Sequence, residues 1–157
     1  MEFLSSRVYN HSAEDIWDVM SDFKSLASTF PQVIDFKESE NNRVRITIRL
    51  DFGKFSGDYF ADFIIHDLSR PDSIKIDGTH KSGIGGMKLE ILANIASEHH
   101  DHHRLTVSGV FKRSGLVSWA GKSIIRNGMD YAMKYLFDLV QERLDRIRQF
   151  RTFTEEE

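Results

Sequence analysis

Residues 116–150 read LVSWAGKSIIRNGMDYAMKYLFDLVQERLDRIRQF, and this stretch decides the fold. Apolar or small side chains recur at steps of three and four, with charged side chains between them. This spacing is typical of an amphipathic helix that lies with one face against a flat apolar surface. The positions on that face are Val117, Gly121, Ile124, Ile125, Gly128, Ala132, Tyr135, Leu136, Leu139 and Ile147. A long C-terminal helix of this kind requires a matching apolar surface elsewhere in the chain.

The residues before this helix supply such a surface, because their apolar and polar side chains alternate. We expect a first strand over residues 3–9, followed by two short helices for which Ser12 and Asp22 are suitable N-cap residues. Apolar and polar residues then alternate, as in half-buried strands, over residues 44–50, 55–65, 74–80, 87–95 and 105–111. This order predicts an α+β fold in which a curved antiparallel sheet of about seven strands wraps around the long C-terminal helix.

The composition excludes several classes of protein. The formal net charge is −3, whereas dedicated nucleic-acid binders usually carry a basic excess, so we expect no nucleic-acid partner. The sequence contains no cysteine, which excludes disulfides and thiol chemistry. Neither a signal peptide nor a transmembrane stretch is recognisable, so we expect a cytoplasmic protein. Its length predicts one domain over residues 1–151, followed by a disordered tail over residues 152–157.

Several short motifs resemble those of a known family. They are DFKSLA at residues 22–27 leading to FP at 30–31, GKFSG at 53–57, GIGG at 83–86, SG at 108–109 and GLVSWAG at 115–121. With the order of elements, they resemble the helix-grip fold of the START-like (SRPBCC) superfamily, and within it the family of the carbon monoxide dehydrogenase G subunit. The resemblance implies a hydrophobic cavity between sheet and helix, in which superfamily members hold lipids, quinones, sterols or polyketides. It also implies an association with a molybdenum-containing carbon monoxide dehydrogenase and with the membrane.

The candidate ligand site consists of the inward-facing residues of the strands and the helix. Ligand sites are mostly apolar with a few placed polar groups, and Tyr59 and His80 would supply those groups here. The candidate residues are Phe55, Tyr59, Phe63, Ile76, His80, Met87, Leu89, Val107, Phe111, Ile124, Ile125, Gly128 and Met129. Missing side chains at Gly78, Gly109, Gly121 and Gly128 would leave room for the ligand. We expect no catalytic residue, no metal ligand and no cofactor.

Two other motifs have simpler interpretations. The histidine-rich segment 99–103 could chelate a metal loosely, but its spacing matches no structural zinc motif, and we expect a solvated hairpin tip. The glycine-rich segment 83–86 lies between strands and lacks the pattern of a phosphate-binding loop, so we expect a hairpin turn.

The sequence therefore predicts a non-catalytic binding or carrier protein for a hydrophobic small molecule, accessory to a carbon monoxide dehydrogenase-type enzyme. One alternative is a cyclase- or aromatase-type enzyme that uses the same cavity, which would need at least two polar cavity residues acting together. The other is a docking protein with a filled core. Between residues 112 and 151 basic residues outnumber acidic ones by nine to four. That helix face could contact a partner enzyme or the inner face of the membrane, or it is an ordinary solvated surface.

Overall fold

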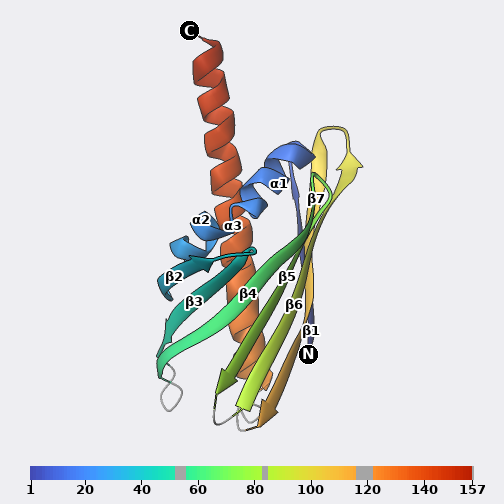
Figure 1. Cartoon of the computed structure of the whole chain (residues 1–157). Coiled ribbons are helices and arrows are strands. Elements are labelled where there is room, and N and C mark those ends of the chain that lie inside the picture. The colour runs from blue at the N-terminus through green and yellow to red at the C-terminus, as the bar shows by residue number, and fades with distance from the viewer. Residues whose placement is uncertain (52–55, 83–84, 116–121, 157) are drawn as a thin grey trace.

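The computed structural model of the chain describes residues 1–51, 56–82, 85–115 and 122–156. A seven-stranded antiparallel sheet curves around one long helix, with two short helices near one end (Figure 1). The elements are β1 (Glu2–Tyr9), α1 (Ala13–Ser21), α2 (Phe23–Thr29), β2 (Val33–Ser39), β3 (Arg43–Leu50), β4 (Gly57–Ser69), β5 (Ser73–Ser82), β6 (Gly85–His99), β7 (His102–Gly115) and α3 (Lys122–Glu155). The predicted α+β class and the predicted arrangement are confirmed.

The strand order is β1-β7-β6-β5-β4-β3-β2, so the first strand lies against the last one. β1 pairs with β7 along its whole length, from Glu2 opposite Val110 to Tyr9 opposite His103. Each remaining pair joins strands that are consecutive in the chain. The sequence pattern does not predict β2, because most of its side chains are exposed and do not alternate.

Both predicted N-caps are present. The Asp15 amide donates to the Ser12 hydroxyl (3.1 Å) at the start of α1, and the Ser25 amide donates to the Asp22 carboxylate (3.4 Å) at the start of α2. These bonds satisfy amides that have no partner inside the helix. Helix α1 lies against α3 and β6, and its Ile16 is fully buried there.

The core lies between the sheet, α1 and the second half of α3. On α3 the most buried side chains are Phe137, Val140 and Leu144, none of which the sequence analysis placed on the inward face. Ile124, which it did place there, is 47% exposed. Helix α3 carries apolar residues on more than one face. Contacts with α1 and the sheet bury the face that contains Leu144. The first turns of α3 are therefore less covered than its middle, from Phe137 to Leu144.

Polar contacts fix the second half of α3 to the N-terminal elements. The Tyr9 hydroxyl donates to the carbonyl of Phe137 inside the core (2.8 Å). Arg151 forms two hydrogen bonds with the Asp15 carboxylate of α1 (2.6 and 2.8 Å), and Arg143 donates to two hydroxyl groups of α2. Arg143 and Arg151, which the sequence analysis counted among the basic residues of either a docking face or a solvated surface, thus hold α3 against α2 and α1.

Helix α3 continues to Glu155 and projects beyond α1 (Figure 1). The sequence predicts a disordered tail from residue 152, but the helix includes the first residues of that tail. The Thr152 and Thr154 hydroxyls donate to the carbonyls of Arg148 and Phe150, one turn earlier (3.0 and 2.9 Å). Threonine is a poor helix former, and inside a helix its hydroxyl commonly bonds to the carbonyl one turn earlier.

Gly78 and Gly109 accommodate aromatic rings rather than empty space. A Cβ atom at Gly78 would lie 2.6 Å from Cε1 of Phe63, its cross-strand partner on β4. A Cβ atom at Gly109 would overlap the ring of Phe3, its partner on β1, and the carbonyl oxygen of Glu90. The expectation that these two glycines leave room for a ligand is therefore wrong.

We expect Gly109→Ala to destabilise the protein by about 1–3 kcal/mol, because a backbone oxygen cannot move aside cheaply. The free energy of unfolding in urea measures this change. Gly128→Ala is the matched control: no atom lies within 4 Å of its added Cβ, so we expect a gain of about 1 kcal/mol from helix propensity. Equal stability of Gly109→Ala and the wild type would contradict the packing described at Gly109.

A group of charged residues between α1 and α3 makes stability depend on pH. His11 is 7% exposed, and its Nε2 lies 3.3 Å from the Asp145 carboxylate. Burial, together with the nearby charge of Arg148, lowers the pKa of His11. The hydrogen bonds from Arg151 lower the pKa of Asp15. Both groups therefore bind protons more readily in the unfolded chain than in the folded one.

Acidification should therefore destabilise the fold in two steps. Stability falls as the pH drops below about 6.5, where unfolded histidine takes up protons, and falls further below about 4, where Asp15 must be protonated. We expect His11→Gln to flatten the dependence of the urea midpoint between pH 7 and 5. His100→Gln is the control, since the His100 side chain is 96% exposed. Identical slopes for all three proteins would show that His11 does not contribute.

Candidate ligand-binding site

The inner face of the sheet brings six of the predicted strand residues together in adjacent cross-strand rows. The rows are Ile65, Ile76, Ile91 and Gly109; Phe63, Gly78, Leu89 and Phe111; and His80, Met87 and Arg113. Neighbouring rows on one face are roughly 7 Å apart, so side chains of successive rows can contact the same small molecule. Six of the predicted residues thus form a continuous patch, and Val107 lies in the next row with Ile74 and Ala93, whereas Tyr59 pairs with Ile48 on β3.

Burial of the inward side chains decreases from one row to the next toward the turn between β5 and β6. Val107 and Ile76 are 1% and 7% exposed, whereas Leu89, Phe111 and Met87 are half-buried. Leu89, Phe111 and Met87 are apolar although their cover decreases, and His80 and Arg113 flank Met87 in the last row. The inner face therefore ends in a partly open apolar surface.

The first turns of α3 present a second partly open surface. Ile124, Gly128, Tyr131 and Tyr135 follow one another at helical spacing along one flank. Tyr135 is covered by the end of α2, since its ring contacts that of Phe30 (4.6 Å between centroids) and its hydroxyl donates to the Thr29 carbonyl (2.9 Å). Before that point no atom lies within 4 Å of a Cβ built on Gly128, apart from the helix's own backbone.

The candidate residues fall into three groups. Ile76 and Val107 are buried in the core. Those that are half-buried are Tyr59, Phe63, His80, Met87, Leu89, Phe111, Ile125 and Met129. Ile124 and Gly128 are exposed on α3. Phe55 and Gly121 lie outside the described residues.

Sequence analysis missed three residues near this surface. Tyr131 and Phe30 belong to the flank of α3 and its cover, and Arg113 is a half-buried cation in the same row as Met87. The helical spacing of Tyr131 after Gly128 was a usable signal. The spacing does not reveal that α2 stops short of Tyr131, because that depends on tertiary packing.

His80 lies where β4 and β5 separate. Their pairing ends with Asp62 opposite Thr79, directly before His80. The His80 ring meets the edge of Phe60 (5.2 Å between centroids), and its Nδ1 atom is buried with no hydrogen-bond partner among the described residues. An unsatisfied buried nitrogen is a position at which a ligand group could form a hydrogen bond.

The histidine-rich segment forms the tip of the β6–β7 hairpin, with His99 opposite His102. The His100 side chain is 96% exposed, and the Nδ1 atom of His103 lies 2.9 Å from the carbonyl oxygen of His11. Within the part of the chain that the structure describes, no group of three or more His, Asp or Glu side chains is placed to hold a metal ion. In the same part, no helix has the length and apolar character needed to cross a bilayer.

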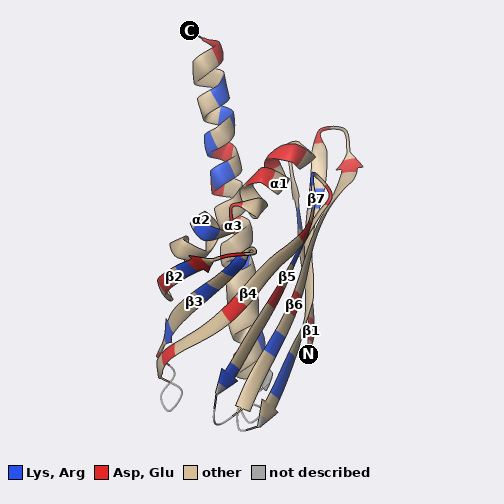
Figure 2. Cartoon of the chain, viewed as in Figure 1, with Lys and Arg blue, Asp and Glu red and all other residues tan. Residues whose placement is uncertain are grey.

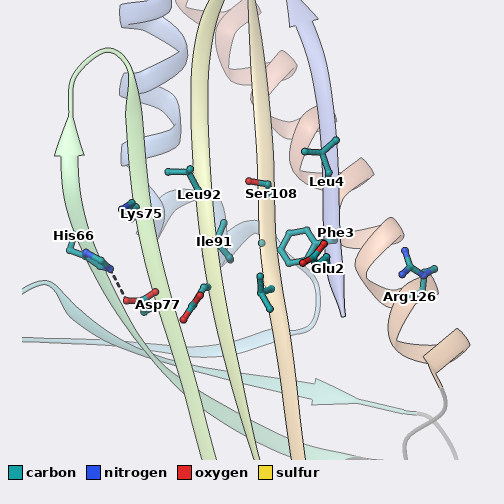
Figure 3. Close-up of a pocket in the computed structure, with 13 residues that line it drawn as sticks. Glu2, Phe3, Leu4, His66, Lys75, Asp77, Ile91, Leu92, Ser108 and Arg126 are labelled. Atoms are coloured by element: carbon teal, nitrogen blue, oxygen red, sulfur yellow. Dashed lines mark hydrogen bonds and ion pairs between the residues drawn. The ribbon is translucent and has the colours of Figure 1, made fainter.

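A pocket of about 680 Å³ lies mainly on the outer face of the sheet, extending to the β1 edge (Figure 3). Leu4, Leu92 and Ser108 line it, and the Nε2 atom of His66 lies 2.8 Å from the Asp77 carboxylate beside it. The pocket includes none of the candidate residues. Sequence alternation gives no sign of it, because outward positions on a strand are expected to face solvent.

Comparison by sequence identifies one family. The family model of the carbon monoxide dehydrogenase G subunit (CoxG) matches residues 7–145, which is most of the chain. No curated protein matches the chain by sequence.

Several solved structures are similar to the chain at low sequence identity. A conserved protein from Geobacillus kaustophilus has a TM-score of 0.80 at 14% identity, covering 93% of this chain and 96% of its own. A START superfamily protein from Mycobacterium smegmatis has a TM-score of 0.66 at 14% identity, covering 93% and 98%. The Zhui aromatase/cyclase from Streptomyces sp. R1128 has a TM-score of 0.63 at 14% identity, covering 93% and 94%. These similarities confirm the START-like, helix-grip type of fold.

Proposed function

The chain belongs to the CoxG family, that of the carbon monoxide dehydrogenase G subunit, and we propose that it is a non-catalytic protein that binds or carries a hydrophobic small molecule, such as a lipid or quinone. The ligand would lie between the inner face of the sheet and the first turns of α3. The supporting observation is the partly open apolar end of that face, where Met87, Leu89 and Phe111 are half-buried. A ligand bound there would cover these three half-buried side chains.

Burial of apolar surface would provide the binding energy. Each Å² of apolar surface removed from water contributes roughly 25 cal/mol, so roughly 300 Å² would contribute about 7 kcal/mol before the entropic cost of association. Tyr59 and His80 would orient a polar head group at the edge of the site. The buried, unpaired Nδ1 atom of His80 supports that role.

Family membership also supports a role as an accessory protein of a molybdenum-containing carbon monoxide dehydrogenase-type enzyme. We expect it to act in the cytoplasm, including at the inner face of the membrane. Contact with the enzyme or with anionic lipid would use those cations of α3 that the fold does not use. Arg126 and Lys134 are two of these, since no ion pair is found for either among the described residues.

A cyclase- or aromatase-type enzyme is the second candidate. The unpaired nitrogen of His80 favours it, as does the likeness in fold to an aromatase/cyclase. General acid–base catalysis by histidine needs a partner that orients the ring, and no carboxylate bonded to His80 is found among the described residues. A binding protein therefore accounts for the site with fewer requirements.

We expect Gly128→Leu to abolish binding of the hydrophobic ligand while the fold is retained. The leucine side chain would occupy the open space on the flank of α3, and leucine favours the helix over glycine. Native mass spectrometry of the purified protein, followed by extraction and identification of any bound lipid or quinone, measures the occupancy. The urea midpoint of the variant reports whether it folds.

Gly128→Ala is the control, because it brings most of the gain in helix propensity with a single methyl group and should keep the ligand. Retention of the ligand by both variants would contradict the assigned site. If the wild type has the mass of the bare chain and does not bind added decanoic acid or a short-chain quinone, a docking protein with a filled core becomes the better interpretation.

A further inference from the structure

A second pocket, of about 420 Å³, lies at the ends of β5, β6 and β7 and has a basic lining. Figure 2 shows Lys and Arg gathered at these strand ends. Outward-facing residues form two cross-strand rows in it: Thr79, Lys88 and Lys112, then Lys81, Gly86 and Ser114. His80, Met87 and Arg113 complete the lining from the rim of the inner face. The pocket is therefore centred on the opposite face of the sheet from the proposed hydrophobic site.

The lysines of this pocket repel one another. Lys88 and Lys112 are directly opposite across β6 and β7, and like charges in that position destabilise a sheet. Lys81 adds a third positive charge in the next row. Among the described residues, the lysines that form ion pairs are Lys37 and Lys75 instead, and no described acidic side chain lines the pocket.

Gly86 lines the pocket in the row that also contains Lys81 and Ser114. A Cβ atom there would lie 3.1 Å from the carbonyl oxygen of His80 and 3.3 Å from the Ser114 hydroxyl. Both distances are shorter than ordinary contacts, so the position favours glycine, and no side chain stands between Lys81 and Ser114. The hydroxyls of Ser114 and Thr79 lie on the same face as the lysines and can donate hydrogen bonds to an acceptor between them.

We propose that this pocket binds a phosphoryl group. A phosphate monoester carries nearly two negative charges at neutral pH and three strong acceptor oxygens, which matches three ammonium groups and two hydroxyl donors. Its charge would also remove the repulsion between Lys88 and Lys112. The group can come from free phosphate or a small phosphorylated molecule, or from the headgroup of an anionic lipid.

Titration of the protein with inorganic phosphate at constant ionic strength tests the proposal. We expect saturable shifts of the backbone amide signals at residues 79–81, 86–88 and 112–114. Replacing both Lys88 and Lys112 by Gln should weaken binding about tenfold or more. The control replaces Lys24 and Lys37 by Gln, which changes the net charge equally and should leave the affinity unchanged. Equal loss in the two double variants would overturn the site.

Flotation with vesicles distinguishes the source of the phosphoryl group. Binding to phosphatidylglycerol-containing vesicles but not to pure phosphatidylcholine, lost with Lys88→Gln and Lys112→Gln, assigns the site to a lipid headgroup. Saturable binding of inorganic phosphate without such flotation assigns it to a soluble ligand. Binding of neither probe by the wild type overturns the proposal.

Folding of the double variant is checked by its thermal midpoint in phosphate-free buffer. Removal of two opposed like charges should leave that midpoint unchanged or raise it. Added phosphate should raise the midpoint of the wild type but not that of the variant. These results are read separately from the Gly128→Leu experiment, because Lys88 and Lys112 lie on the outer face of the sheet and Gly128 lies on α3, although the two sites share His80 and Met87 at the rim.

Discussion

The buried hydrogen bond from the Tyr9 hydroxyl to the Phe137 carbonyl joins the first strand to the middle of the last helix. Burial raises the pKa of Tyr9, so its hydroxyl keeps its proton and remains a donor. Because donor and acceptor are both shielded from water, loss of either would leave the other unsatisfied. The Arg151–Asp15 pair repeats the connection further along, between α3 and α1. Together these contacts determine where α3 lies on the sheet.

These contacts of Tyr9 and Arg151 explain why side chains are more buried in the middle of α3 than in its first turns. The half that contacts β1, α1 and α2 contains Val140 and Leu144, both fully buried. The half that precedes it reaches over the sheet beyond the cover of α2 and leaves Ile124 and Gly128 exposed. An apolar helix flank and an apolar strand end thus lie at the same end of the molecule with incomplete cover. Incompletely covered apolar surface of this kind often marks a site of interaction.

The fold could be predicted from sequence because it depends on local signals. Alternation with a period of two located most strands, and Ser12 and Asp22 located two short helices through their caps. The site could be predicted only in part. Phe63 opposite Gly78 and Phe3 opposite Gly109 are cross-strand pairs whose register is set by distant parts of the chain. When an aromatic ring packs over a glycine on a neighbouring strand, it fills the space that the missing side chain would otherwise leave.

The alternation that shapes the core also places two kinds of chemistry at one end of the sheet. Along β6, Met87 and Leu89 face the inner side while Lys88 between them faces the outer side, and β7 repeats the pattern with Phe111 and Lys112. Successive side chains of a strand point to opposite faces of the sheet, so the residues between the apolar ones lie on the outer face. At the buried end of the sheet those outward positions carry mixed charges, whereas here they are basic (Figure 2). None of the residues in the Tyr9–Phe137 and Arg151–Asp15 contacts belongs to either proposed site.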